Sequence, residues 1–167
     1  DLQVVVENDV PLAKTATASI RVEEDELSTG ITDSDGFTQT ATFAKADLQA
    51  LVNPGADEVN STTGVTFTLN TGLTGKVQTT DATPLDVKSQ GAQVVYGADN
   101  GDVVGFVNLG GGAGFDSGTD REVFRLTDNG NGSFTFTLKD QIDHATAAGD
   151  DGTLTLNLTK AFGAKDY

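Results

Sequence analysis

Side chains alternate between apolar and polar in short stretches throughout the chain, and this period of two is the feature that most limits its fold. In residues 133–138, "SFTFTL", Phe134, Phe136 and Leu138 share one face. Successive side chains of a strand point to opposite faces of its sheet, so such a stretch is typical of a half-buried β-strand. No long stretch carries a convincing helical stripe. The pattern therefore predicts an all-β fold.

The predicted strands are short and closely spaced. Single strands are expected at residues 2–6, 16–22, 38–43, 64–70 and 153–158, and hairpins with Asn-Gly turns at residues 92–107 and 121–138. The inward positions expected in the single strands are Ala16, Ala18, Ile20, Val22, Ala41, Phe43, Val65, Phe67, Leu69, Leu154, Leu156 and Leu158. About eight to ten strands at this spacing predict an Ig/cadherin-like antiparallel β-sandwich with one or two short helical turns.

Residues 45–55 are the helical candidate. Asp47 is expected as its cap, Leu48 and Leu51 lie on one face, and Pro54-Gly55 is the predicted stop. A helix of this length adds little to the fold. The segment is therefore expected to form about two turns of helix between strands.

The charge of the chain makes cations its natural partners. Twenty-five Asp and Glu residues against ten Lys and Arg give a net charge of -15. This charge repels nucleic acid and anionic lipid, and it destabilises the compact state unless counter-ions sit where carboxylates crowd. The chain has no cysteine, which excludes disulfides, thiolate metal sites and thiol nucleophiles.

No stretch of the sequence reads as a membrane or targeting segment. A membrane helix needs about 18 consecutive apolar residues, and residues 1–15 lack the pattern of a signal peptide. The chain also has no methionine. We therefore expect it to be a piece of a longer precursor, with no membrane insertion of its own.

Calcium is the cation that these acidic loops favour, because it takes six to eight oxygen ligands from flexible carboxylate-rich segments. Three clusters stand out: "EEDE" (23–26) with "DSD" (33–35), "END" (7–9), and "KDQID" (139–143) with "GDDG" (149–152). A solvated acidic loop is the competing interpretation of each. The candidate calcium ligands are Asp9, Glu23, Glu24, Asp25, Asp33, Asp35, Asp140, Asp143, Asp150 and Asp151.

Catalytic interpretations have less support. His144 is the only histidine, and a hydrolase would need it as the base beside a nucleophile, yet no G-x-S-x-G elbow is present. A glycosidase needs two carboxylates, but the chain has no tryptophan and only two tyrosines to stack on sugar rings. Residues 111–119, "GGAGFDSGT", match a calcium-binding β-roll nonapeptide except at Gly118, and no second copy follows. We interpret these residues as a glycine-rich loop. A less favoured alternative is that Asp116 or Asp120 binds an ion.

Several phrases together resemble a known family. These are "VVVENDVPLA" (4–13), "VEEDEL" (22–27), "VVGFV" (103–107), "VFRLTDNGNGSFTFTLKDQIDHA" (123–145) and "DGTLTLNL" (151–158). They resemble the repeat domains of giant type I-secreted RTX adhesins of Gram-negative bacteria, and they are spread over almost the whole chain. The hairpin that ends in "FTLKDQIDH" (136–144) is the most specific of them.

The resemblance implies an extracellular module at the bacterial cell surface, one link in a polypeptide that holds a cell to a surface or biofilm. Its partners would be the neighbouring repeats, and calcium would make it rigid. Residues 1–11 would be the last strand and linker of the preceding repeat, or a strand that completes this domain, and residues 12–167 would form a single β-sandwich repeat. A glycan- or peptide-binding module of the same adhesin is the alternative, and a hydrolase the distant one.

The chain departs from the family pattern in three places. Asn8 replaces an acid of the linker phrase, and the insert at residues 108–120 is longer and richer in glycine than the resemblance implies. The family also continues beyond "AKDY" (164–167) into a final strand. Two explanations are open: the chain is cut short of that strand, or, as a hypothesis, residues 2–6 fill its place in this sandwich or in a neighbour's.

Overall fold

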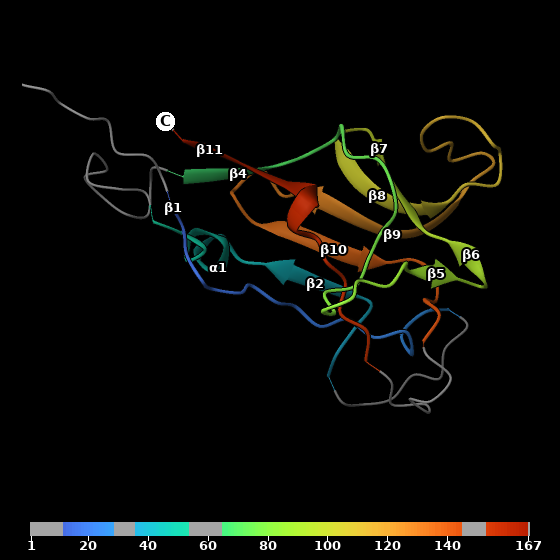
Figure 1. Cartoon of the computed structure of the whole chain (residues 1–167), viewed down its shortest axis with the longest axis horizontal. Coiled ribbons are helices and arrows are strands. Elements are labelled where there is room, and N and C mark those ends of the chain that lie inside the picture. The colour runs from blue at the N-terminus through green and yellow to red at the C-terminus, as the bar shows by residue number, and fades with distance from the viewer. Residues whose placement is uncertain (1–11, 29–35, 54–64, 145–152, 167) are drawn as a thin grey trace, which may run out of the picture.

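The computed structural model describes residues 12–28, 36–53, 65–144 and 153–166. Within them the regular elements are almost all β-strands in antiparallel sheets, with one short α-helix and one 3-10 turn (Figure 1). The predicted all-β sandwich is confirmed. The predicted strand at residues 2–6 lies outside the described residues.

The main sheet has five strands in the order β2-β10-β9-β8-β7, and every neighbouring pair is antiparallel. The strands are β2 (Thr40–Phe43), β7 (Val95–Asp99), β8 (Asp102–Val107), β9 (Arg121–Asp128) and β10 (Phe134–Leu138). The two predicted hairpins form its centre. Their polar-apolar alternation puts one row of side chains in the core and the other on the outer face.

The turns of both hairpins depend on residues that tolerate left-handed backbone. Asn100 (φ 52°) and Gly101 (φ 94°) join β7 to β8, which is the type I′ geometry that matches the twist of the flanking strands. Between β9 and β10, the Asp128 side chain accepts a 2.8 Å hydrogen bond from the amide of Gly130. Both turns were expected from their Asn-Gly pairs.

Smaller pieces form the second layer. β4 (Val65–Leu69) pairs with β11 (Phe162–Asp166), while isolated bridges join Thr79 to Leu156 and Lys76 to Val95. The remaining elements are β1 (Leu12–Ala13), α1 (Lys45–Gln49), β3 (Val52–Asn53), β5 (Lys88–Ser89), β6 (Ala92–Gln93) and the 3-10 turn η1 (Thr159–Ala161). β1 pairs with β3, and β5 pairs with β6.

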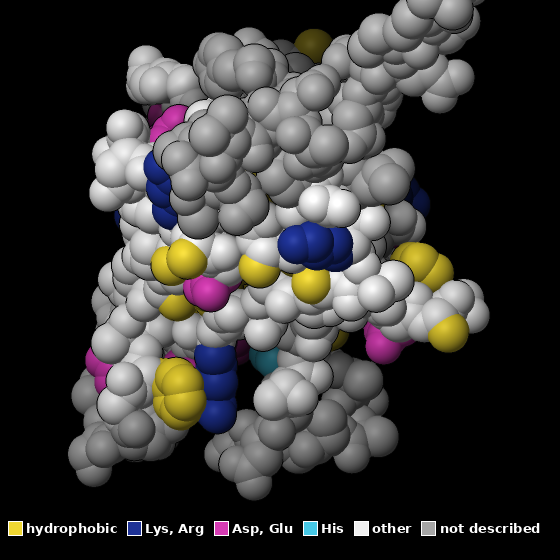
Figure 2. All heavy atoms as spheres, turned by 90° about the vertical axis from the view of Figure 1, so that its left-hand side faces the viewer, with side chains coloured by type: hydrophobic (Ala, Val, Ile, Leu, Met, Phe, Trp, Pro, Cys, Tyr) yellow, Lys and Arg dark blue, Asp and Glu magenta, His cyan; other side chains and the backbone are white. Residues whose placement is uncertain are grey.

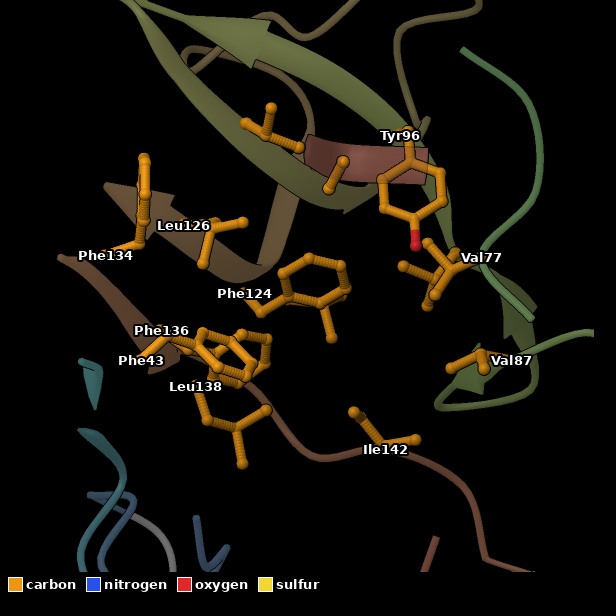
Figure 3. Close-up of a cluster of buried hydrophobic side chains, with 14 of the residues drawn as sticks. Phe43, Val77, Val87, Tyr96, Phe124, Leu126, Phe134, Phe136, Leu138 and Ile142 are labelled. Atoms are coloured by element: carbon orange, nitrogen blue, oxygen red, sulfur yellow. The ribbon is translucent and has the colours of Figure 1, made fainter. Parts of the chain in front are cut away.

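Aromatic rings join the two layers. Phe124 lies at the centre of the core, stacked on Phe136 at 5.1 Å and edge-on to Tyr96 at 6.2 Å (Figure 3). Phe162 of β11 meets both Phe43 (5.7 Å) and Phe134 (5.1 Å) edge-on. Each edge-to-face contact stabilises the core by about 0.5–1.5 kcal/mol, in addition to the effect of burying the rings. The second layer is therefore fixed to the main sheet through Phe162.

The outer face of the main sheet is itself partly covered. Val104 and Phe106 point away from the main core but are 0% and 1% exposed. Phe115, from the glycine-rich loop, packs edge-on against Phe106 at 5.3 Å, where Gly97 leaves room for the ring. The insert at residues 108–120 thus folds back over β7 and β8.

Three local predictions were wrong in detail. Residues 16–22 and 153–158 are not strands of a sheet, although Ala18, Ile20, Val22 and the three leucines do pack against the core as expected. Ala16 is exposed. α1 ends at Gln49 and begins after Ala44, so Asp47 lies in its first turn and makes no capping bond. Side-chain periodicity predicts which residues face inward, whereas sheet membership depends on backbone partners far away in sequence.

Candidate calcium site

The corner after β10 is held by backbone bonds to two other segments. The amides of Lys139 and Asp140 donate to the carbonyl of Val123 at 2.8 and 3.1 Å. The amide of Asp143 donates to the carbonyl of Lys88 at 2.8 Å, and Ile142 is buried in the core. The corner is not helical. Its two aspartates, Asp140 and Asp143, therefore do not lie on a common helical face.

Asp140 is engaged in a polar cluster. Its carboxylate forms an ion pair with Arg121 and accepts bonds from Gln90 Nε2 at 3.1 and 3.2 Å. Arg121 also donates to the side chain and the carbonyl of Ser89, which is fully buried. An arginine with this many fixed acceptors positions the surrounding segments. Asp140 thus ties the corner to β5 and β9.

Asp143 has a similar structural role. Its Oδ2 accepts a 2.7 Å bond from the amide of Gly91, in the turn between β5 and β6. Gly91 has φ +80°, so this turn exposes its amide in a conformation that glycine favours. Its other carboxylate oxygen, Oδ1, accepts no bond from the described residues. Asp143 is therefore the aspartate of this corner with an oxygen available to an ion.

Glu24 reaches the same corner from the other end of the sequence. Its Oε1 accepts a 2.5 Å bond from the amide of Ile142 and lies 3.5 Å from Nε2 of His144. Two of the predicted acidic clusters are thus adjacent in space. Glu23 instead forms an ion pair with Arg21, whose guanidinium lies 4.1 Å above the ring of Phe37, and Asp25 is exposed.

The other predicted ligands are Asp9, Asp33, Asp35, Asp150 and Asp151, and all five lie outside the described residues. Among the residues that the structure describes, no three His, Asp or Glu side chains gather as a metal-binding group. Glu24, Asp140 and Asp143 are placed at one corner, each with a protein partner. The calcium site therefore stays a prediction.

Arg125 organises a second acidic group, which we did not predict from the sequence. Its guanidinium donates to Asp99 (2.8 Å), Asp102 (2.9 Å) and Glu122 (2.7 Å). These bonds raise the pKa of Arg125 further above its ordinary value, with Glu122 the largest contributor. The signal was in the sequence: acids flank the Asn100-Gly101 turn, and the next strand carries Arg125 on its polar face. The group closes one end of the main sheet.

The Asp120 carboxylate holds the glycine-rich loop in place through hydrogen bonds to its backbone. Its carboxylate accepts bonds from the amides of Leu109 (2.8 Å), Gly110 (3.0 Å) and Asp116 (2.9 Å). These backbone donors, Gly110 foremost, lower the pKa of Asp120 below its ordinary 3.8. Asp116 in turn accepts a bond from the amide of Gly118 at 2.9 Å. Both carboxylates accept hydrogen bonds from backbone amides of the loop. This is a different role from the ion binding that the sequence offered for Asp116 or Asp120.

Comparison of this chain with protein-family models, with curated proteins and with solved structures finds no match. In the described part of the chain the longest helix is α1, at five residues, so no helix there is able to cross a bilayer. The adhesin resemblance accordingly rests on the sequence phrases alone.

Proposed function

We propose that this chain is a calcium-stabilised structural module of a large secreted bacterial RTX adhesin, in which it extends or connects other domains in attachment to a surface or biofilm. The proposal joins the sequence resemblance to the β-sandwich and the strongly acidic composition. Such a module works by holding its shape. Its requirements are a firm core and a means of neutralising crowded carboxylates.

The observation that carries the calcium part is the meeting of Glu24 and the 140–144 corner. In the sequence, Asp33 and Asp35 follow Glu24 within eleven residues, and Asp150 and Asp151 follow His144 within seven. Glu24 and His144, which precede these two acidic segments in the sequence, therefore lie at one corner of the fold. Asp143 already presents a carboxylate oxygen there that the described residues do not use.

Thermal unfolding with and without EDTA tests this proposal. An ion that binds only the folded state at about 100 times its Kd adds about 2.7 kcal/mol, which is a large share of the stability of a small domain. We expect the melting temperature to fall in EDTA and to recover with excess calcium. Asp33→Asn with Asp35→Asn should weaken the recovery, whereas the exposed Asp81→Asn should not. An unchanged melting temperature in EDTA would show that calcium does not stabilise the fold.

The alternative, a ligand-binding module that uses the loop at residues 108–120, has a narrower basis. Leu109 is 63% exposed beside a recess of about 270 Å³ lined by Phe115 and Asp116. The carboxylates and the Asn108 amide of this loop are bonded within the loop, and Phe115 covers Phe106. The contacts favour a structural role for the insert, so the structural module stands first.

A further inference from the structure

A second recess lies where α1, β4 and the turn between β9 and β10 meet. It has a volume of about 350 Å³, within the range of small-ligand sites. Its described lining comprises Lys45, Gln49, Val65, Thr66, Phe67 and residues 130–132. We call it the Lys45 recess. Lys and Arg side chains (dark blue) are exposed on the face of the molecule that Figure 2 shows, although the net charge is -15.

Lys45 is held across the turn by its aliphatic stem. A Cβ on Gly132 would lie 3.0 Å from Cδ and 3.2 Å from Cγ of Lys45, so the absence of a side chain at Gly132 lets the stem cross there. Gly132 also has φ +84°, which favours glycine. The ammonium group of Lys45 makes no ion pair with any described residue. A positioned, unpaired cation in an acidic protein is available to an anionic ligand.

The other polar groups of the recess add donors. Asn131 Oδ1 already accepts bonds from the amide (3.0 Å) and the hydroxyl (2.7 Å) of Ser133, so its remaining capacity is the Nδ2 amide group, a donor. The hydroxyl oxygen of Thr66 is buried and, within the described chain, is the side-chain polar atom left without a hydrogen-bond partner. A buried hydroxyl without a partner is unfavourable, and a ligand oxygen removes that penalty.

We propose that the Lys45 recess binds the carboxylate of an acidic sugar. Lys45 Nζ would pair with the carboxylate, Asn131 Nδ2 and the Thr66 hydroxyl would meet ring oxygens, and β4 and residues 130–132 complete the lining. The volume suits one or two sugar rings rather than a folded partner. This inference does not rest on calcium, because every group that carries it is a donor or apolar.

Glucuronate is the probe and glucose the uncharged control, each titrated into the ¹⁵N-labelled protein and followed by amide chemical shifts. We expect glucuronate to shift the amides of residues 130–132 and α1, and glucose to shift them much less. Lys45→Met keeps the stem over Gly132 and removes the charge, so it should weaken glucuronate binding by about tenfold or more. Lys139→Met, at an exposed lysine elsewhere, should leave binding unchanged. Thr66→Val is the second test if Lys45→Met loses its native spectrum, and it should also weaken binding.

Because uronates bind calcium, the titration is run both in EDTA and with calcium. Binding that survives Lys45→Met, that appears only with calcium, that glucose reproduces equally, or that shifts residues 110–120 instead would overturn the proposal, as would the absence of any shift. The EDTA melt tests the structural role of calcium separately, so either proposal can fail without the other.

Discussion

The amide of Ile142 donates a 2.5 Å hydrogen bond to Oε1 of Glu24, across 118 residues of sequence. Ile142 is buried, so its amide has little access to water as a substitute acceptor. The bond joins the segment before β2 to the corner after β10. Among the described residues no strand pairing joins these two segments directly, so the Glu24 carboxylate links them.

Glu24→Ala should therefore destabilise the fold by about 1–2 kcal/mol, because it leaves the Ile142 amide without its acceptor. Urea unfolding in EDTA measures this loss without any contribution from calcium. Glu26→Ala is the matched control, since the Glu26 side chain makes no bond within the described residues, and it should change stability by less than about 0.5 kcal/mol. Equal losses in the two variants would show that the bond contributes nothing.

Arg125→Leu should cost about 1–3 kcal/mol at neutral pH, because Asp99, Asp102 and Glu122 would then repel one another without a cation between them. Arg21→Leu removes an exposed ion pair and should cost less than about 1 kcal/mol. A loss at Arg125 no larger than the loss at Arg21 would contradict this account.

Asp120 should make a visible contribution to acid unfolding. Its pKa is lower in the folded chain than its ordinary 3.8, so its stabilising effect is complete above that value and is lost as the pH falls through the folded pKa. Asp120→Asn should therefore be less stable than the wild type at about pH 6 and approach it at about pH 2. Melting curves across this range measure the difference. Asp81→Asn should follow the wild type throughout, and an Asp120→Asn curve parallel to it would refute the assignment.

Gly105→Ala tests the packing of the central ring. A Cβ there would lie 2.1 Å from Cε1 of Phe124, a fully buried side chain with no room to move. Overpacking of this kind costs about 1–3 kcal/mol or more. Gly112→Ala meets nothing within 4 Å and should be close to neutral. A Gly105→Ala protein as stable as the wild type would mean that the core at Phe124 is loosely packed.

Much of the fold was predictable because the hairpins are local. Phe134, Phe136 and Leu138 face the core as their alternation indicates, and the Asn100-Gly101 pair forms the expected turn. β11 was missed, since the residues at 162–166 show no clear alternation and their partner β4 lies far away in sequence. Non-local pairing of that kind leaves little trace in the pattern of either strand.

The sequence predicted which acidic residues could contribute to the candidate site, but not how they are arranged. The sequence indicated Glu24, Asp140 and Asp143 as acids in loops. Their hydrogen-bond partners are the Ile142 amide for Glu24, Arg121 of β9 and Gln90 for Asp140, and the Gly91 amide for Asp143. Which carboxylate meets an arginine and which meets an amide depends on the placement of those partners. Arg121 and Arg125 show the same limit, because a strand pattern fixes the face of a side chain and not the residues across from it.

The position of Phe162 also affects the order in which the molecule can form. Its ring lies against Phe43 and Phe134, and its strand is the hydrogen-bonded partner of β4. During synthesis from the N-terminus, the residues of the central hairpins leave the ribosome before Phe162. The aromatic side chains that Phe162 covers therefore lack this contact until residue 162 has been made. Contacts of such long range close late and slowly. Until then the nascent chain exposes Phe43 and Phe134, and premature association during synthesis is the hazard that this topology carries.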